Sequence, residues 1–279
     1  MTRLELATGL DRVGDRVQRG VHALLRPQRV RDALHGVWLG HPLHPAVVQL
    51  PIGAWTCSTV LDLIPGQERA ATTLVALGTA SALPAALTGA NDWASLSREQ
   101  RRVGLVHAMA NGVGLALFAG SLVARLGGRH GLGRTLGLLG MTVASGGAYL
   151  GGHLAYKQAA GVNNGVPELR RMEDGWHPVA DLDTLPQRTL LTRRLDDVSV
   201  VVYRDGDDVT VMLERCAHQS GPLGAGQVVQ VDGHACVVCP WHGSTFQLNG
   251  GEVVHGPAGT DQQVLPTRVN RGVLEARLP

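Results

Sequence analysis

Two short Cys–His pairs in the carboxy-terminal third of the chain are the residues best suited to chemistry. The first pair is Cys216 and His218, and the second is Cys239 and His242. Thiolates and neutral imidazoles ligate iron–sulfur clusters and also zinc. Each pair fits within one loop, so two adjacent loops could hold a small metal group from both ends. Ligand type by itself leaves two candidates, a two-iron, two-sulfur cluster and a structural zinc ion.

The residues around these pairs carry a family resemblance. The stretches CAHQSGPLGAG and CPWHGSTFQLNGGEVVHGPAG closely resemble the two cluster loops and the following Pro-containing loop of the Rieske family, over roughly residues 176–279. The resemblance implies a small all-β domain that transfers single electrons through one [2Fe–2S] cluster. It also implies that Cys216 and Cys239 hold one iron while His218 and His242 hold the other.

The same resemblance assigns roles to residues beside the ligands. Gly243 permits a tight turn at the cluster, and Ser244 donates a hydrogen bond to a bridging sulfide. The loop containing Gly256 and Pro257 covers the flank of the cluster. These residues are expected to support the cluster without ligating it.

Three positions depart from the high-potential members of the family, which have a disulfide between the loops and a Tyr that hydrogen-bonds a ligand sulfur. This chain has Gly221, Trp241 and Phe246 at the corresponding positions. The disulfide and the Tyr hydroxyl are therefore both absent. Because hydrogen bonds to sulfur raise the reduction potential, we expect a potential in the lower half of the Rieske range, below about +100 mV.

The spacer between His218 and Cys239 is longer than is common in the ferredoxin and oxygenase branches. Its sequence QVVQVDGHACVV predicts a long hairpin. Cys236 lies three residues before Cys239, a spacing that also suits a zinc site. The residues from Ala235 to Val238 have the pattern of a strand entering the second loop, so we expect Cys236 to be a buried thiol that is not a ligand.

Composition favours two domains and few partner classes. The chain has 279 residues, a net charge of +2 and only four cysteines, three of which fall in the Rieske-like part. A near-neutral balance without interleaved aromatics gives no reason to expect nucleic-acid binding. Clustered cysteines indicate metal binding and not a disulfide framework.

Four apolar stretches precede the β-type region, at roughly residues 45–64, 70–90, 104–125 and 133–155. Each has about the length that a helix needs to cross a membrane, so the sequence predicts four transmembrane helices. Short connections make neighbouring helices antiparallel, and small residues would let them pack closely. The predicted domains are an amphipathic segment (1–34), the four-helix membrane domain (35–157), a linker (158–175) and the Rieske domain (176–279).

The distribution of basic residues predicts the orientation. On the side of the termini, thirteen Lys and Arg lie outside the β-type region. Four lie on the other side, in two short loops: Arg69, Arg125, Arg129 and Arg134. The positive-inside rule then places both termini and the Rieske domain in the cytoplasm, at a bacterial inner membrane. In the amino-terminal segment, apolar residues from Leu10 to Leu24 alternate with charged ones at helical spacing. Such a helix fits a membrane surface or an ordinary protein surface equally well.

The membrane half also carries a resemblance. HPLHPAVVQLPIGAW and GANDW are similar to an uncharacterised family of four-helix bacterial membrane domains, sometimes fused to Rieske domains, over roughly residues 35–157. The predicted topology places five ionisable residues at one membrane level: His41, His44, Asp92, His107 and His153. Such a group could ligate haem or exchange protons with a quinone. It could equally consist of interface residues that contact water and helix ends.

These observations predict a membrane-anchored Rieske protein. It would carry single electrons between a soluble donor or acceptor protein and a component of the lipid bilayer. No complete catalytic site is visible. An oxygenase needs a separate domain for a mononuclear iron, and the 37 residues after His242 are too few to form one. A component of a Rieske-type oxygenase system and a zinc or redox-sensing membrane protein are the alternatives.

Overall fold

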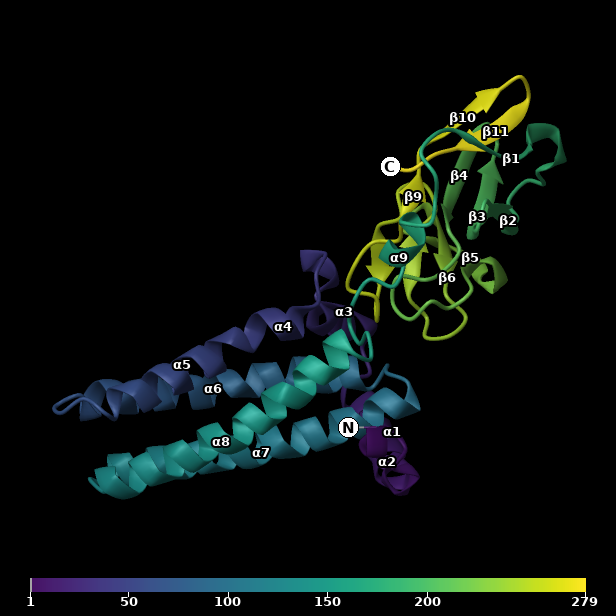
Figure 1. Cartoon of the computed structure of the whole chain (residues 1–279). Coiled ribbons are helices and arrows are strands. Elements are labelled where there is room, and N and C mark those ends of the chain that lie inside the picture. The colour runs from purple at the N-terminus through teal and green to yellow at the C-terminus, as the bar shows by residue number, and fades with distance from the viewer. Residues whose placement is uncertain (1) are drawn as a thin grey trace. The chain divides into compact units, whose positions relative to one another are not determined.

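The computed structural model describes residues 2–279, and the chain forms two compact units. The helical unit contains residues 2–27 and Leu43–Ala160. The β unit contains Gln28–Pro42 and Gly161–Pro279. The chain therefore passes between the units three times, and a short amino-terminal segment belongs to the β unit (Figure 1).

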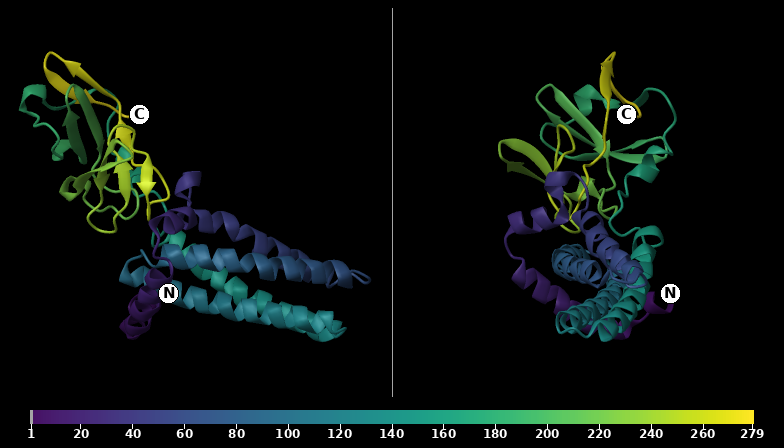
Figure 2. Two further views of the ribbon diagram at one scale, coloured as in Figure 1. Left: turned by 180° about the vertical axis from the view of Figure 1, so that it is seen from behind. Right: turned by 90° about the vertical axis from the view of Figure 1, so that its left-hand side faces the viewer.

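Long helices make up most of the helical unit and run side by side (Figures 1 and 2). The short α1 (Thr2–Glu5) and a 3₁₀ turn precede α2 (Asp11–Leu24). The other helices of this unit are α4 (Leu43–Val47), α5 (Gln49–Leu61), α6 (Glu68–Trp93), α7 (Arg98–Leu126) and α8 (His130–Tyr156). A capping box starts α7, in which the Ser97 hydroxyl accepts from the Gln100 N–H and the Gln100 side chain accepts from the Ser97 N–H.

Two of the four expected membrane spans are borne out by length and composition. Within residues 2–279, α6 and α7 are long and apolar enough to cross a membrane. The first expected span is divided into α4 and α5, because Pro51 has no N–H to bond the carbonyl of Val47. The fourth, α8, has sufficient length at 27 residues, but its many glycines contribute little hydrophobicity. Of the four expected spans, two are therefore long and apolar enough to cross a membrane.

Aromatic stacking and small residues hold the long helices together. The rings of Trp55 and Phe118 stack with centroids 4.2 Å apart. A side chain at Gly78 would collide with Trp55, and one at Gly140 would crowd Phe118, so glycine permits both contacts. Near the ends of α5 and α7, the buried guanidinium of Arg125 donates to the Asp62 carboxylate at 2.8 Å.

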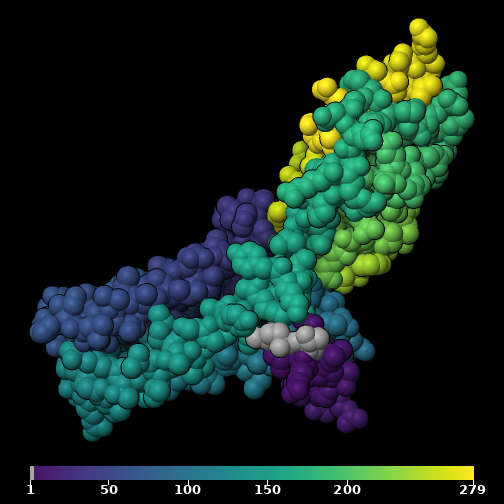
Figure 3. Space-filling view, in the orientation of Figure 1, coloured from purple at the N-terminus to yellow at the C-terminus, as the bar shows by residue number. Residues whose placement is uncertain are grey.

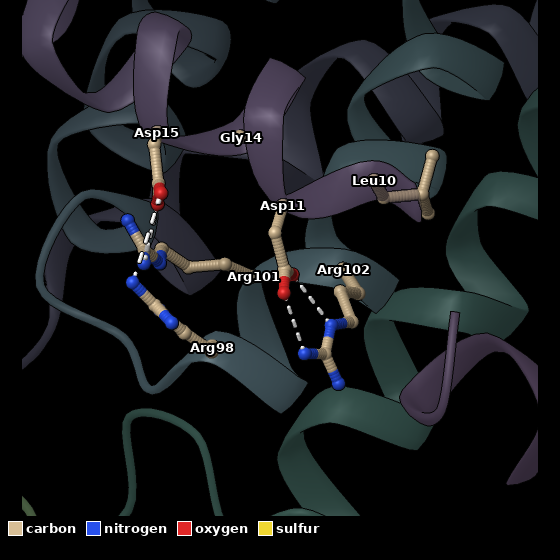
Figure 4. Close-up of a pocket in the computed structure, with 7 residues that line it drawn as sticks. All are labelled: Leu10, Asp11, Gly14, Asp15, Arg98, Arg101 and Arg102. Carbon is tan, nitrogen blue, oxygen red and sulfur yellow. Dashed lines mark hydrogen bonds and ion pairs between the residues drawn. The ribbon is translucent and has the colours of Figure 1, made fainter. Parts of the chain in front are cut away.

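The amino-terminal helix α2 lies across the end of this bundle and forms a ridge there (Figures 2 and 3). Asp11 receives two hydrogen bonds from Arg102, and Asp15 pairs with Arg101 at 3.1 Å (Figure 4). The acidic face of α2 therefore meets the start of α7. Its side chains Val13 and Val17 are exposed instead. The predicted amphipathic helix is confirmed, with its acidic side towards the protein.

The β unit consists of three antiparallel sheets. Their strand orders are β1-β11-β10, β2-β3-β4-β9 and β5-β6-β7-β8. The strands are β1 (His177–Asp181), β2 (Leu191–Leu195), β3 (Val198–Asp205), β4 (Asp208–Leu213), β5 (Gln227–Val231), β6 (His234–Val238), β7 (Thr245–Gln247), β8 (Val253–His255), β9 (Val264–Leu265), β10 (Thr267–Asn270) and β11 (Val273–Ala276). A short helix, α9 (Val166–Leu169), precedes them. The predicted all-β domain is confirmed.

The predicted long hairpin is present as β5 and β6. Val231 pairs with His234, and Asp232 and Gly233 form the turn with positive φ angles of 49° and 83°. Positive φ angles at both turn residues match the right-handed twist of the two strands that a two-residue turn connects. Cys236 is fully buried in β6 and pairs with Val229 of β5. Cys236 therefore lies within the strand and outside the Cys–His loop that follows it.

Residues 28–42 pack onto the β unit as helix α3 (Gln28–His35) and a 3₁₀ turn (Val37–Leu39). Gly36 and Gly40 end these elements in the left-handed conformation, with φ angles of 81° and 64°. Val37 contacts the buried cluster of side chains that includes Cys216 and Cys239. From the sequence, this segment is expected to divide between the amphipathic segment (1–34) and the membrane domain (35–157), whereas its contacts lie with the β domain.

Candidate metal centre

The first Cys–His loop begins where β4 ends. The Cys216 N–H donates to the carbonyl of Gly221 at 2.9 Å, and the Ser220 N–H donates to the Cys216 carbonyl at 2.8 Å. Ser220 adopts a left-handed φ of 58° to close this turn. These bonds fold the loop tightly, so the side chains of Cys216 and His218 leave from one compact turn.

The second loop joins β6 to β7 and has the same kind of closure. The Cys239 N–H donates to the Ser244 carbonyl at 2.8 Å, and the Gly243 N–H donates to the Cys239 carbonyl at 3.0 Å. Gly243 has a φ of 78°, a conformation that glycine adopts without steric cost. The tight turn expected at Gly243 is therefore present.

The two loops bring like groups together. The thiols of Cys216 and Cys239 are within hydrogen-bonding reach of each other. The imidazole centroids of His218 and His242 lie 5.1 Å apart, with the rings nearly perpendicular. In residues 2–279, no three His, Cys, Asp or Glu side chains converge on one ion-sized point. A sulfur pair beside an imidazole pair suits a group with two metal atoms better than one tetrahedral ion.

Backbone N–H groups point at both sulfurs. The Cys216 sulfur receives hydrogen bonds from the N–H groups of His218 and Gln219. The Cys239 sulfur receives them from Trp241 and His242. The hydrogen bond from the Cys216 thiol, aided by these N–H groups, lowers the pKa of Cys239 to about 6. The partner thiol and burial raise the pKa of Cys216. Metal binding would require both thiols to lose their protons.

The imidazoles are held neutral. Burial, with smaller contributions from His242 and His35, lowers the pKa of His218 to about 3. Burial also lowers the pKa of His242. Neutral imidazoles are the form that ligates metals. The two rings differ in exposure, because His218 is 8% exposed whereas His242 is open to solvent.

The residues assigned supporting roles lie beside these loops. The Ser244 hydroxyl is fully buried and accepts from the Ala258 N–H at 3.0 Å, which leaves its proton available to donate. Gly256 and Pro257 precede Ala258, so this bond ties their loop to the second Cys–His loop. Phe246 is fully buried in the same cluster of side chains as both cysteines. Its ring supplies packing and no hydrogen bond.

The backbone of Gly221 comes close to the side chains of Cys239 and Trp241. A Cβ at this position would come 2.7 Å from the Cys239 sulfur and 3.1 Å from the Trp241 ring. Where high-potential members of the Rieske family have a disulfide between the loops, this chain has Gly221 packed beside the Trp241 ring. Trp241 itself remains 57% exposed.

Two residues of the site were missed by the sequence analysis. Buried Gln262 accepts from the Ala217 N–H at 2.8 Å and donates to the carbonyls of Leu213 and Arg215. Asn164 donates to the His218 carbonyl at 2.7 Å, while its own N–H donates to the Ala217 carbonyl. Both residues clamp the first loop from distant parts of the chain, and neither has a spacing that marks it.

The five ionisable residues expected in the membrane half are not gathered into one cluster. His44 donates through Nδ1 to the Ala85 carbonyl of α6 at 2.9 Å. His107 donates through Nδ1 to the Gly147 carbonyl of α8 at 2.7 Å. These bonds join neighbouring helices. The two rings are near enough to interact electrostatically.

The other three have separate surroundings. His153 bonds the Glu5 carboxylate at 2.8 Å. Asp92 is half-buried in the last turn of α6. His41 belongs to the β unit, where its exposed ring contacts the Pro42 carbonyl. Of this set, His44 and His107 are the pair that interacts across two helices.

Comparison with known proteins identifies both parts of the chain. Residues 175–266 match the model of the Rieske [2Fe–2S] domain. Residues 40–164 match a family described as a predicted membrane protein, DUF2231. The chain thus contains a Rieske domain, which implies a [2Fe–2S] cluster, and a predicted membrane domain. The pairing of the two sulfurs and of the two imidazoles fits that cluster.

Two curated proteins share the Rieske part. A Rieske domain-containing protein of Homo sapiens is 34% identical over 70 residues, and the match spans 25% of this chain and 45% of that protein. The anthranilate 1,2-dioxygenase ferredoxin subunit of Burkholderia cepacia is 28% identical over 103 residues, spanning 37% of this chain and 92% of that protein. Among solved structures, the ferredoxin of carbazole 1,9a-dioxygenase from Nocardioides aromaticivorans IC177 is 24% identical with a TM-score of 0.35, covering 38% of this chain and all of that one.

Proposed function

We propose, from the premise that one chain joins a Rieske domain to a predicted membrane domain, that this protein is a membrane-anchored one-electron carrier. Its Rieske domain would exchange electrons with a soluble redox protein and with a component of the membrane. The observation that carries the proposal is the meeting of a sulfur pair and an imidazole pair in two adjacent loops.

We assign Cys216 and Cys239 to one iron and His218 and His242 to the other. The hydrogen-bonding reach between the two sulfurs supports the first assignment, because both sulfurs face the same small space. The neutral, neighbouring imidazoles support the second. When bound, the cluster supplies the one-electron chemistry. The protein's residues hold it, point N–H groups at its sulfur ligands and limit its contact with water.

Four helices would form the membrane anchor. Large apolar side chains are exposed on α5 and α8 as well as on α6 and α7, among them Ile52, Val60, Leu138 and Leu139. Exposed apolar surface on every side of a helix bundle fits a lipid environment. The joined helices α4 and α5 extend over Leu43–Leu61, which approaches the length of a span. This exposed apolar surface supports two further spans beside α6 and α7, one formed by α4 with α5 and one by α8.

The orientation that we propose places both termini and the Rieske domain in the cytoplasm. The excess of Arg and Lys near the termini supports it through the positive-inside rule. The soluble partner is then a cytoplasmic redox protein. One similar protein is the ferredoxin subunit of a dioxygenase, so an oxygenase or a reductase component is the class of partner to test first.

For the membrane component we retain His44 and His107. Each ring bonds a backbone carbonyl through Nδ1, so Nε2 would be the unprotonated nitrogen of a neutral imidazole held this way. A ring in that state can ligate haem iron or accept a proton from a quinol. An optical spectrum of the purified protein decides between them, since bound haem has a strong Soret band and a quinone has none.

The experiment that tests the function is a set of ligand variants in the full-length protein. Ala in place of His218 or His242 should remove iron and acid-labile sulfide while the protein remains in the membrane fraction. Val269→Ala alters an exposed side chain on β10 and serves as the control. Stoichiometric zinc without sulfide in the anaerobically purified wild type would favour the zinc alternative and defeat the proposal.

A further inference from the structure

The segment 28–42 lies against the loop that flanks the candidate cluster site. The Asp32 carboxylate accepts from the Gly256 N–H at 2.9 Å and contacts His255 Nδ1 at 3.0 Å. Further along the segment, the ring of Pro42 lies beside Gly259. The segment therefore follows the loop from residue 255 to residue 259, although more than two hundred residues separate them in the chain.

His35 occupies the centre of this contact. Its side chain is 5% exposed, and a Cβ at Gly256 would come 2.7 Å from its Cδ2. It is near enough to His218 for the two imidazoles to interact electrostatically. The next residue but one, Val37, packs against the side chains that surround Cys216 and Cys239.

This packing accounts for the unequal exposure of the two imidazoles. His218 is on the side where the segment lies and is buried, whereas His242 is open to solvent. The cover comes from the stretch that immediately precedes the first membrane helix.

We propose that segment 28–42, through His35 and Asp32, is a built-in cover of the cluster that keeps its reduction potential low. This inference rests on the proposed function. One added electron makes the cluster and its two thiolates one charge more negative. Water stabilises that charge, whereas a buried environment and a nearby carboxylate disfavour it. Loosening the cover or removing the Asp32 charge therefore favours reduction.

The test is a potentiometric titration of the full-length protein, followed by electron paramagnetic resonance. His35→Ala and Asp32→Asn should each raise the reduced-to-oxidised ratio at a fixed solution potential about threefold, which is about 30 mV for a one-electron couple. Val30→Ala, on an exposed position of the same helix, should leave the potential unchanged. Iron and sulfide contents should equal those of the wild type in all three.

A double variant tests the contact itself. Gly256→Ala pushes a methyl group into the His35 ring and should raise the potential like His35→Ala. In the His35→Ala background the same methyl group meets no ring, so it should add nothing further. If His35→Ala loses the cluster, Asp32→Asn keeps the shape of the side chain and decides the matter.

Two outcomes overturn the inference in distinguishable ways. Fully loaded variants with the wild-type potential would show that the segment is only a structural contact, and the proposed function would stand. A wild-type protein without iron and sulfide would remove the proposed function and the cover with it.

Discussion

The β unit and the helical unit both contain histidines that suggest chemistry, yet they use them differently. In the β unit, His218 and His242 leave from two closed turns and come within 5.1 Å of each other. In the helical unit, His44 and His107 bond carbonyls of neighbouring helices, and His153 bonds Glu5. Ligand residues that share a short loop are placed by that loop's own hydrogen bonds. Residues on separate long helices are placed by helix packing, which a sequence does not display.

The largest expected effect contrasts a ligand with a membrane histidine. Cys239→Ser should abolish the rhombic electron paramagnetic resonance signal of the reduced cluster, because the site loses one of its two sulfur ligands. His44→Ala should leave the signal and the iron content intact, since that ring serves helix packing in the other unit. Loss of the cluster in His44→Ala would show that the two units are not independent.

Stability of the helical unit can be weakened separately. The Arg125 guanidinium is fully buried against Asp62, and removal of one partner leaves an unpaired buried charge. Arg125→Ala should destabilise the bundle by about 3–5 kcal/mol. Circular dichroism at the helical band, in detergent, measures the loss, with exposed Arg129→Ala as the control. An equal effect of both variants would mean that the pair is not buried in the membrane form.

The corresponding weak point of the β unit is Gln262. Gln262→Ala removes three hydrogen bonds from the first Cys–His loop and leaves buried groups unsatisfied. We expect a cost of about 1–3 kcal/mol and a faster loss of the cluster on warming. Gln263→Ala, at the neighbouring half-buried position, should retain the cluster as long as the wild type does.

Smaller effects should appear in the potential of an intact cluster. Ser244→Ala should lower the potential, because the buried hydroxyl would donate to sulfide. Phe246→Tyr should raise it if the new hydroxyl reaches a ligand sulfur. Each shift should be tens of millivolts, since about 59 mV equals a tenfold change in a one-electron equilibrium. A silent Ser244→Ala with a potential near the top of the Rieske range would assign control to burial.

The smallest effect concerns acid and the amino terminus. The hydrogen bond from His153 lowers the pKa of Glu5 below its ordinary value of 4.5. The pair therefore stabilises the fold above that ordinary pKa, and the contribution is lost as the pH falls through the lowered one. Hydrogen exchange of α1 should accelerate over this acidic range in the wild type. Glu5→Gln should show no such acceleration.

Much of the β unit could be predicted from the sequence because its information is local. The Asp232-Gly233 turn specifies the long hairpin, and the Cys–His spacings specify two loops of the same kind. Asp32, His35, Asn164 and Gln262 could not be found this way. Their contacts join residues far apart in the chain, and a lone polar side chain carries no spacing by which to recognise it.

The membrane half shows the opposite balance. Hydropathy located the helices, but the interruption at Pro51 and the glycine content of α8 reduced four expected spans to two. The common membrane level of the five ionisable residues stays a prediction, because helix ends do not determine side-chain partners. His41 even belongs to the other unit, since the predicted membrane domain begins at residue 35, within segment 28–42 of the β unit.

In the function that we propose, two Cys–His loops hold a two-iron cluster in a membrane-anchored chain. Iron and acid-labile sulfide analysis of the full-length protein, purified anaerobically from membranes, tests this proposal together with electron paramagnetic resonance after reduction. We expect two irons and two sulfides per chain and a rhombic signal, because sulfur and nitrogen ligands make the two irons unequal. One zinc per chain, without sulfide and without a signal, would contradict it.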